Sequence, residues 1–283
     1  VLGSRGLGDV YKRQALTILE REPFESMPAY LLIENDLMSL PAALRAIHFP
    51  KNQEEADSAA KRLAFDEMLI LQLGMLMLKE KSRKSTPCVM NKKTGLDEFY
   101  ASLPFKMTAA QLRCVKEITD DLSSGVPMNR LLQGDVGSGK TAVAAAACYF
   151  SYKNGYQSAL MAPTEILAVQ HYKTLSGFLE PLGIKTVLLT GSMTVKEKRA
   201  VKDELMSGEA GVAVGTHAII QKDVEFASLG LVITDEQHRF GVRQRGMLAE
   251  KAANPHLLVM SATPIPRTLG LLIYGDLDIS ILD

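Results

Sequence analysis

The sequence predicts an α/β fold, in which a parallel sheet carries helices on both faces and follows a helical region. Three observations support this prediction. From Leu103 onward, short apolar segments bounded by turns alternate with helical segments. A glycine-rich loop lies between one apolar segment and an alanine-rich stretch. Earlier in the chain, Glu54–Lys84 has a wide apolar stripe at helical spacing. Buried strands that alternate with helices form parallel sheets covered on both faces.

Composition narrows the possible classes of protein. The 283 residues are 47% hydrophobic, enough for a substantial core, and their net charge of +0 means that any basic surface for nucleic acid must be local. Cys88, Cys114 and Cys148 are widely spaced, which disfavours a zinc site or a disulfide framework and agrees with a cytoplasmic location. No apolar run reaches the ~18 residues of a membrane span.

The region ahead of the sheet is expected to be helical. Val1–Gln14 has no clear periodicity, so residues 1–14 are expected to be a non-native or disordered tail. Prolines divide Ala15–Pro50 into short predicted helices, and Glu54–Lys84 predicts one long helix with a solvated basic end, for which phosphate contact is the alternative. Ser85–Tyr100 is polar and is expected to be a linker. Residues 15–100 are therefore expected to form a helical linker region and residues 101–283 the sheet domain.

The sheet domain is expected to contain six strands and at least five helices. The expected strands are Arg130–Gln133, Ser158–Ala162, Thr186–Leu189, Val212–Gly215, Leu231–Thr234 and Leu257–Ser261. The expected helices are Ala142–Ala147, Thr164–Leu179, Lys196–Ser207, Gly241–Lys251 and Pro266–Tyr274. Ligands of such sheets bind beyond the carboxyl ends of the strands, so residues after each strand are the candidate site residues.

The loop after the first expected strand fits the phosphate-binding pattern G-x-x-x-x-G-K-[ST]. Its glycines let the backbone bend so that consecutive N–H groups and a helix N-terminus face an anion. Lys140 supplies a point charge for the β- and γ-phosphates, and the Thr141 hydroxyl can bind Mg²⁺. The alternative is a glycine-rich turn before a helix. The candidate nucleotide-binding residues of the loop are Gly134, Asp135, Val136, Gly137, Ser138, Gly139, Lys140 and Thr141.

Two carboxylates follow the apolar strand that begins at Leu231. Asp235 at the strand end can hold Mg²⁺, directly or through water, and Glu236 can orient or deprotonate an attacking water. His238 is a third candidate catalytic residue in the same segment. The alternative is a helix N-cap with solvated acids.

Small and hydroxyl residues follow the other strands. They offer N–H groups and hydroxyls, which can grip a nucleic-acid backbone without reading bases, although each is singly a common turn. The candidates are Pro163, Thr164, Gln170, Thr190, Gly191, Gly215 and Thr216. Ser261, Ala262 and Thr263 are candidates for coupling the nucleotide site to a second site, with a capped strand-to-helix turn as the alternative. One helix before the loop, Gln111 could pair with adenine and Phe105 could stack on it, although a Gln at a helix start is common.

In this order, GDVGSGKT, APTEILAVQH, TGS, VGTHAII, DEQHRFGVRQR and SATPIPRTL resemble motifs I, Ia, Ib, Ic, II and III of superfamily-two helicases. DEQH followed by FGV, and TPIPRTL, most closely resemble the RecG family of bacterial ATP-dependent DNA helicases. The Mfd family of duplex DNA translocases shares HRFGV and TPIPRTL but usually has DEEH. LPAALRAIHFP also resembles the RecG segment between wedge and motor. The resemblance extends from Phe24 to Asp283.

The resemblance implies a RecA-like P-loop NTPase fold, ATP and Mg²⁺ as cofactors, and branched or forked duplex DNA as partner. It implies a monomeric, ATP-dependent helicase that remodels stalled forks in recombination and repair. Lys140, Thr141 and Asp235 would hold the nucleotide, Glu236 would position water, and Ser261 and Thr263 would relay the nucleotide state. The wedge domain and a second motor lobe with arginine fingers are expected outside these residues. We therefore expect this chain to bind Mg-ATP and to hydrolyse it slowly.

Two other functions fit the same motifs. An Mfd-like protein would move along duplex DNA without separating its strands. A nucleotide- and DNA-binding half-motor would not hydrolyse ATP. A small-molecule kinase with a phosphate loop is disfavoured by the DEQH and SAT segments.

Overall fold

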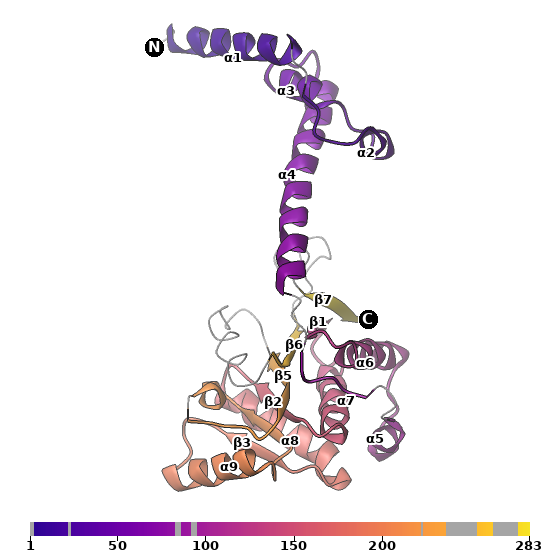
Figure 1. Ribbon diagram of the computed structural model, residues 1–283, viewed down its shortest axis with the longest axis vertical. Helices are drawn as coiled ribbons and strands as arrows, with labels where there is room; N and C mark the ends of the chain where they lie inside the picture. The colour runs from indigo at the N-terminus through magenta and orange to yellow at the C-terminus, as the bar shows by residue number, and fades with distance from the viewer. Residues whose placement is uncertain are drawn as a thin grey trace. The chain divides into compact units, whose positions relative to one another are not determined.

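The computed structural model describes residues 3–21, 24–82, 86–91, 95–221, 223–235, 254–262 and 277–283 (Figure 1). The chain divides into two compact units, Val1–Met77 and Leu78–Asp283. Within the described ranges, no helix is long and apolar enough to cross a membrane.

The first unit is helical, as expected. It contains α1 (Gly3–Arg21), α2 (Ala29–Glu34), α3 (Leu40–His48) and the start of the long helix α4 (Gln53–Ser82). Pro41 lies in the first turn of α3, where a missing N–H costs nothing, and Glu54 and Glu55 lie in the first turn of α4, where they favour the helix dipole. Helix α1 includes residues 3–14 of the segment expected to be a non-native or disordered tail, and that expectation stays a prediction.

A buried arginine organises the first unit. The Arg62 side chain on α4 is fully buried and donates to both carboxylate oxygens of Glu25, at 2.6 and 3.1 Å, and to the Met38 carbonyl at 2.7 Å. Its Nε also donates to Asp66 one turn away, at 3.1 Å. Glu25 further accepts from the Leu40 N–H, which begins α3. The hydrogen bond from Arg62 lowers the pKa of Glu25 to about 2. This cluster therefore ties α4 to the segments around α2 and α3.

The second unit is built on a seven-stranded sheet in which every pairing is parallel, so the predicted α/β fold is confirmed. Its order is β3-β4-β2-β5-β6-β1-β7. All six expected strands are present, within two residues of their expected ends. The strands are β1 (Asn129–Gly134), β2 (Gln157–Met161), β3 (Thr186–Leu189), β4 (Val212–Gly215), β5 (Leu229–Asp235), β6 (His256–Ser261) and β7 (Asp278–Leu282). Strand β7 was not predicted.

Helices cover both faces of the sheet. On one face, α6 (Ala109–Leu122), α7 (Lys140–Lys153) and α8 (Glu165–Leu179) share a core with strand residues such as Leu132 and Leu160. On the other face, α9 (Val195–Ser207) and the short helix η2 (His217–Ile220) pack against residues such as Ala159 and Val187. Alternate strand residues thus face opposite cores. The remaining described helices are α5 (Asp97–Ser102) and η1 (Glu180–Leu182). The predicted helices Gly241–Lys251 and Pro266–Tyr274 lie outside the described residues.

The segment expected to be a linker is partly core. Met90 and Phe99 are buried in the main core, and the Phe99 ring on α5 packs against the Tyr149 ring on α7. The Cys88 carbonyl accepts from His256 Nε2 at 2.7 Å, and His256 Nδ1 accepts the Met128 N–H at 2.9 Å. Burial lowers the pKa of His256, in keeping with this neutral tautomer. A few apolar residues in a polar stretch carry no periodic signal, so the expectation of a linker was wrong for this part of the chain.

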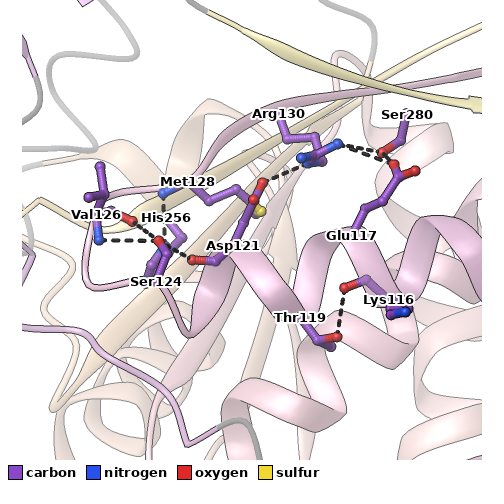
Figure 2. Close-up of polar contacts among 10 residues, drawn as sticks. All are labelled: Lys116, Glu117, Thr119, Asp121, Ser124, Val126, Met128, Arg130, His256 and Ser280. Carbon is purple, nitrogen blue, oxygen red and sulfur yellow. Dashed lines mark hydrogen bonds and ion pairs between the residues drawn. The ribbon is translucent and has the colours of Figure 1, made fainter. Parts of the chain in front are cut away.

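Strand β7 is fixed at the sheet edge by a polar network (Figure 2). Arg130 on β1 donates to Asp121 at 2.7 Å, to Glu117 at 3.2 Å and to Ser280 Oγ at 2.8 Å. The Ser280 hydroxyl on β7 also donates to Glu117. At the end of β7, Arg113 on α6 donates to the Ile281 carbonyl at 2.8 Å. Helix α6 therefore holds both β1 and the edge strand.

Candidate nucleotide site

The candidate site residues lie along one edge of the sheet. Because all strands are parallel, their carboxyl ends lie together, and the strand order divides this edge into two halves. Strands β5, β6 and β1 end at Asp235, Ser261 and Gly134 and carry the nucleotide candidates. Strands β3, β4 and β2 are followed by the candidate nucleic-acid residues. The two halves meet where β5 pairs with β2.

The phosphate loop joins β1 to α7 as the motif predicts. Gly137 and Gly139 have φ of 85° and 86°, in the left-handed region that glycine adopts without strain. Helix α7 begins at Lys140, and no side chain caps its N-terminus. The first N–H groups of α7 are therefore not taken by a cap and can face an anion.

Two residues from outside the loop, Gln111 and Leu282, lie very close to its glycines. The Gln111 side-chain amide, at the start of α6, donates to the Ser138 carbonyl at 2.8 Å. A Cβ at position 139 would lie 2.3 Å from Gln111 Nε2, and a Cβ at position 134 would lie 2.8 Å from the Leu282 Cβ on β7. Glycine is therefore favoured at position 139 by the left-handed backbone and the closeness of Gln111, and at position 134 by packing against Leu282.

Gly139→Ala is expected to lower the free energy of unfolding of the second unit by about 1–2 kcal/mol, the cost of a left-handed non-glycine residue. It is also expected to weaken binding of a fluorescent ATP analogue, because it displaces Gln111 from the loop. Gly155→Ala is a matched control, since Gly155 has φ of 82° and open space at its Cβ position. Urea unfolding should show a similar loss for both variants, while nucleotide affinity falls only for Gly139→Ala. Equal affinities would contradict the packing argument.

The structure uses Gln111 differently from the adenine-pairing role proposed for it. Its Oε1 accepts the Thr108 N–H at 2.9 Å, and its own N–H donates to Thr108 Oγ1, so the two residues form a capping box for α6. A pocket beside the loop is lined by Thr108, Ala110, Gln111, Asp135, Val136, Gly137, Ser138, Leu282 and Asp283. Phe105 does not line this pocket. Its ring packs edge to face on Phe178, with 6.0 Å between the centroids.

The loop supplies donors suited to a triphosphate. Lys140 Nζ donates to the Gly134 carbonyl at 2.6 Å and to the Asp135 carbonyl at 2.8 Å. Burial lowers the pKa of Lys140, and the negative charges of Asp235 and Asp135 oppose that shift. Ser138 Oγ is buried and has no hydrogen-bond partner in the described part of the chain. A partly desolvated ammonium, an unsatisfied hydroxyl and a helix N-terminus in a glycine cradle fit an anionic phosphate group.

The carboxylate at the end of β5 has a partner that the sequence did not reveal. His171 Nε2 on α8 lies 2.6 Å from Asp235 Oδ2, and the two side chains are 11% and 14% exposed. His171 lies within the APTEILAVQH segment, but its partner is 64 residues away, so no local pattern predicts this contact. Glu236, His238 and Thr263 lie outside the described residues. Ala262 is half-buried beside β6.

No group of three or more His, Cys, Asp or Glu side chains that could hold a metal occurs among the described residues. Mg²⁺ commonly binds through one or two protein oxygens together with substrate phosphates and water. Thr141 in the first turn of α7 and Asp235 offer such oxygens.

Several candidate nucleic-acid residues have structural contacts. Thr164 caps α8 by accepting the Leu167 N–H at 3.3 Å, and Thr190 is buried with its hydroxyl 3.3 Å from that of Ser192. Gly215 is buried, and a Cβ there would lie 2.0 Å from the Leu189 carbonyl oxygen. Pro163 and Thr216 are half-buried, whereas Thr164, Gln170 and Gly191 are exposed on this half of the edge.

The loop after β3 is joined to α8. The Ser192 N–H donates to Glu165 Oε1 at 3.0 Å. Hydrogen bonds from the Ser192 side chain and from its backbone lower the pKa of Glu165. Lys198 on α9 donates to the Gly191 carbonyl at 2.6 Å. The Ser192 amide, one of the N–H groups expected to face phosphate, is therefore bonded within the protein. Ser261 is buried at the end of β6, between β1 and β5, so it lies inside the nucleotide half of the edge.

Comparisons with known proteins agree with this arrangement. The sequence model of the family described as DEAD/DEAH box helicase matches residues 108–271. The "ATP-dependent DNA helicase RecG" of Aquifex aeolicus is 49% identical over 96% of this chain and 36% of its own length. The protein of the same name from Streptococcus pneumoniae is 49% identical over 92% of this chain and 39% of its own length. A solved structure, "Structure of RecG bound to three-way DNA junction", matches 96% of this chain and 37% of its own, with 42% identity and a TM-score of 0.73. The chain thus spans well under half of these relatives.

Proposed function

Because the chain belongs to the DEAD/DEAH box helicase family, we propose that it is the ATP-binding motor lobe of a DNA helicase that remodels branched DNA in recombination and repair. The observation that carries the proposal is the phosphate loop of β1 and α7, which shares one sheet edge with Asp235. Relatives named RecG that match most of the chain support the choice of DNA, and the junction complex of one of them supports a branched substrate.

The proposed cofactors are ATP and Mg²⁺. Loop amides, Lys140 and Ser138 would bind the phosphates, and Thr141 and Asp235 would hold the cation. Bound Mg²⁺ would neutralise phosphate charge. Glu236 would orient the attacking water, with His238 beside it. Gln111 supports the loop through Ser138, and Phe105 and Gln111 remain candidates for adenine contact.

On the other half of the edge, the exposed residues Thr164, Gln170 and Gly191 would meet the DNA backbone, with Pro163, Thr190, Gly215 and Thr216 shaping the loops. Ser261, Ala262 and Thr263 would respond to the nucleotide. Residues 101–283 would form the motor lobe and residues 15–100 would lead into it, with 86–91 and 95–100 packed on the lobe. Further partners are a wedge domain and a second motor lobe. We also propose a cytoplasmic location, since Cys88, Cys114 and Cys148 are free thiols. The proposed oligomeric state is a monomer.

The test replaces the matching segment of the Aquifex aeolicus relative with this chain and measures ATP hydrolysis with three-way-junction DNA and with linear duplex of the same length. Stronger stimulation by the junction supports the proposal. Equal stimulation by both DNAs would favour a duplex translocase. If the 283-residue chain binds nucleotide but the chimera never hydrolyses it, a half-motor that only binds would be the better description.

Binding of the chain to three-way-junction DNA is expected to weaken steeply with salt, because the proposed contacts go to phosphates. Three such contacts would reduce affinity about 40-fold between roughly 50 and 200 mM salt. Fluorescence anisotropy with a labelled junction measures this slope. Affinity that stays constant over this range would contradict backbone contact as the main source of binding.

A further inference from the structure

We propose that His171 is a positioning residue for Asp235. Through this contact, α8 connects the magnesium site to the nucleic-acid half of the sheet edge. This inference rests on the proposed function. Asp235 would be the metal carboxylate there, and the contact with His171 is the only hydrogen bond of its side chain among those found in the described residues.

The contact has a defined direction. A carboxylate only accepts hydrogen bonds, so His171 Nε2 must be the donor to Asp235 Oδ2. The separation of 2.6 Å is that of a strong, charge-assisted hydrogen bond. With both side chains largely buried, water competes little for either partner. The bond occupies one carboxylate oxygen and restricts rotation of the group, which favours one orientation for the other oxygen.

The place of His171 on its helix is unusual for a polar residue. The buried face of α8 consists of Ala168, His171, Leu175 and Leu179, which recur at three- and four-residue spacing. The other three are apolar and buried, and the two leucines pack in the main core. A leucine at position 171 would continue the apolar row, whereas the histidine reaches the tip of β5. Packing alone therefore does not require a histidine at this position.

Helix α8 contacts both halves of the sheet edge. Its first residue, Glu165, accepts the Ser192 N–H of the loop after β3, and Thr164 caps the helix. His171 lies six residues further along, about 9 Å at the rise of an α-helix. Strand β5, which carries Asp235, pairs with β2, which precedes α8.

The experiment measures equilibrium binding of a fluorescent ATP analogue to the 283-residue chain, with Mg²⁺ titrated and with EDTA. His171→Leu removes the hydrogen-bond donor and replaces the imidazole with an apolar side chain of similar size. His171→Gln keeps an amide donor that can replace Nε2. His48→Gln, which changes an exposed histidine on α3, is the control.

His171→Leu is expected to lose at least about 10-fold of the Mg²⁺-dependent gain in affinity, the usual effect of removing a partner of a metal ligand. Its affinity in EDTA should stay within about two-fold of the unchanged chain, by the same argument. His171→Gln should recover most of the gain, and His48→Gln should behave as the unchanged chain. An equal loss with Mg²⁺ and with EDTA, or no loss at all, would overturn the proposal.

A double-mutant cycle covers the case in which His171→Leu also lowers the melting temperature. On an Asp235→Asn background, the substitution should retain any effect on melting but cause no further change in Mg²⁺ dependence. A further change there would show that His171 does not act through Asp235. If the unchanged chain gains no affinity from Mg²⁺, the proposed function fails and the inference fails with it. If instead the unchanged chain and all variants show the same Mg²⁺-dependent gain in affinity, only the inference about His171 fails.

Discussion

Lys140→Ala is expected to lower the affinity of the chain for Mg-ATP about 100-fold, because charge-assisted hydrogen bonds to phosphate contribute up to about 3 kcal/mol. The same change should not destabilise the unliganded protein. Burial lowers the pKa of Lys140, so the charged lysine is held at a cost that alanine does not carry. Arginine is not an adequate replacement, since its planar group cannot reproduce the compact ammonium between the Gly134 and Asp135 carbonyls. Titration calorimetry and thermal unfolding measure the two effects.

Lys153→Ala is the matched control for this experiment. Lys153 lies in the last turn of the same helix and pairs with exposed Glu98 at 3.0 Å, away from the loop. Its replacement should leave nucleotide affinity unchanged, since it removes a lysine of the same helix without touching the candidate site. Retained Mg-ATP binding by Lys140→Ala would remove the main support for the proposed site.

Arg62→Ala is expected to destabilise the helical unit by about 3 kcal/mol, the lower end of the cost of removing one partner from a buried ion pair. The lower end applies because the Glu25 and Asp66 side chains are 27% and 20% exposed and can be hydrated in part. Urea unfolding followed by circular dichroism measures the loss. Glu67→Ala, which removes an exposed charge from the same helix, should change stability by no more than about 0.5 kcal/mol. Similar values for both variants would show that the Arg62 cluster does not organise this unit.

The Glu25 carboxylate adds a dependence on pH. Its pKa is about 2 in the folded chain, against an ordinary value of 4.5. A lowered pKa means that the unfolded chain takes up the proton first, so the stabilisation is complete above pH 4.5 and is lost as the pH falls toward 2. After allowance for solvent screening, the amount is on the order of 2 kcal/mol. In Arg62→Ala this dependence should largely disappear, and a slope equal to that of the unchanged chain would assign the effect to other groups.

The sequence predicted those parts of the fold that depend on local pattern. Strands such as β1 and β5 are continuous apolar runs between turns, and the glycine loop has a spacing that only a few structures satisfy. Strand β7 was missed because Asp278–Leu282 is a short edge strand that buries Ser280 and exposes Ile281, so hydrophobicity does not follow burial there. The burial of Met90 and Phe99 was missed because each lies in a very short apolar cluster, Cys88–Met90 or Phe99–Tyr100, within a polar stretch.

The site residues were predictable only where the residue types and their spacing together match a motif. Lys140 and Thr141 lie in a motif whose geometry follows from its glycines. The partner of Gln111 is the Ser138 carbonyl, 27 residues away, and that of Asp235 is His171. Such contacts depend on which strands become neighbours in the sheet. No residue-level pattern encodes that order.

The position of β1 in the sheet bears on how the chain folds. Its two neighbours are β6 and β7, and Met128 and His256, which bond beside it, are 128 residues apart. Strands β2, β3 and β4, by contrast, come from one continuous stretch of chain. During synthesis this stretch can pair early, whereas β1 stays without neighbours until residues 256–282 have been made. The phosphate loop, although it comes first of the motifs in the sequence, is therefore expected to be among the last parts of the unit to acquire its final shape.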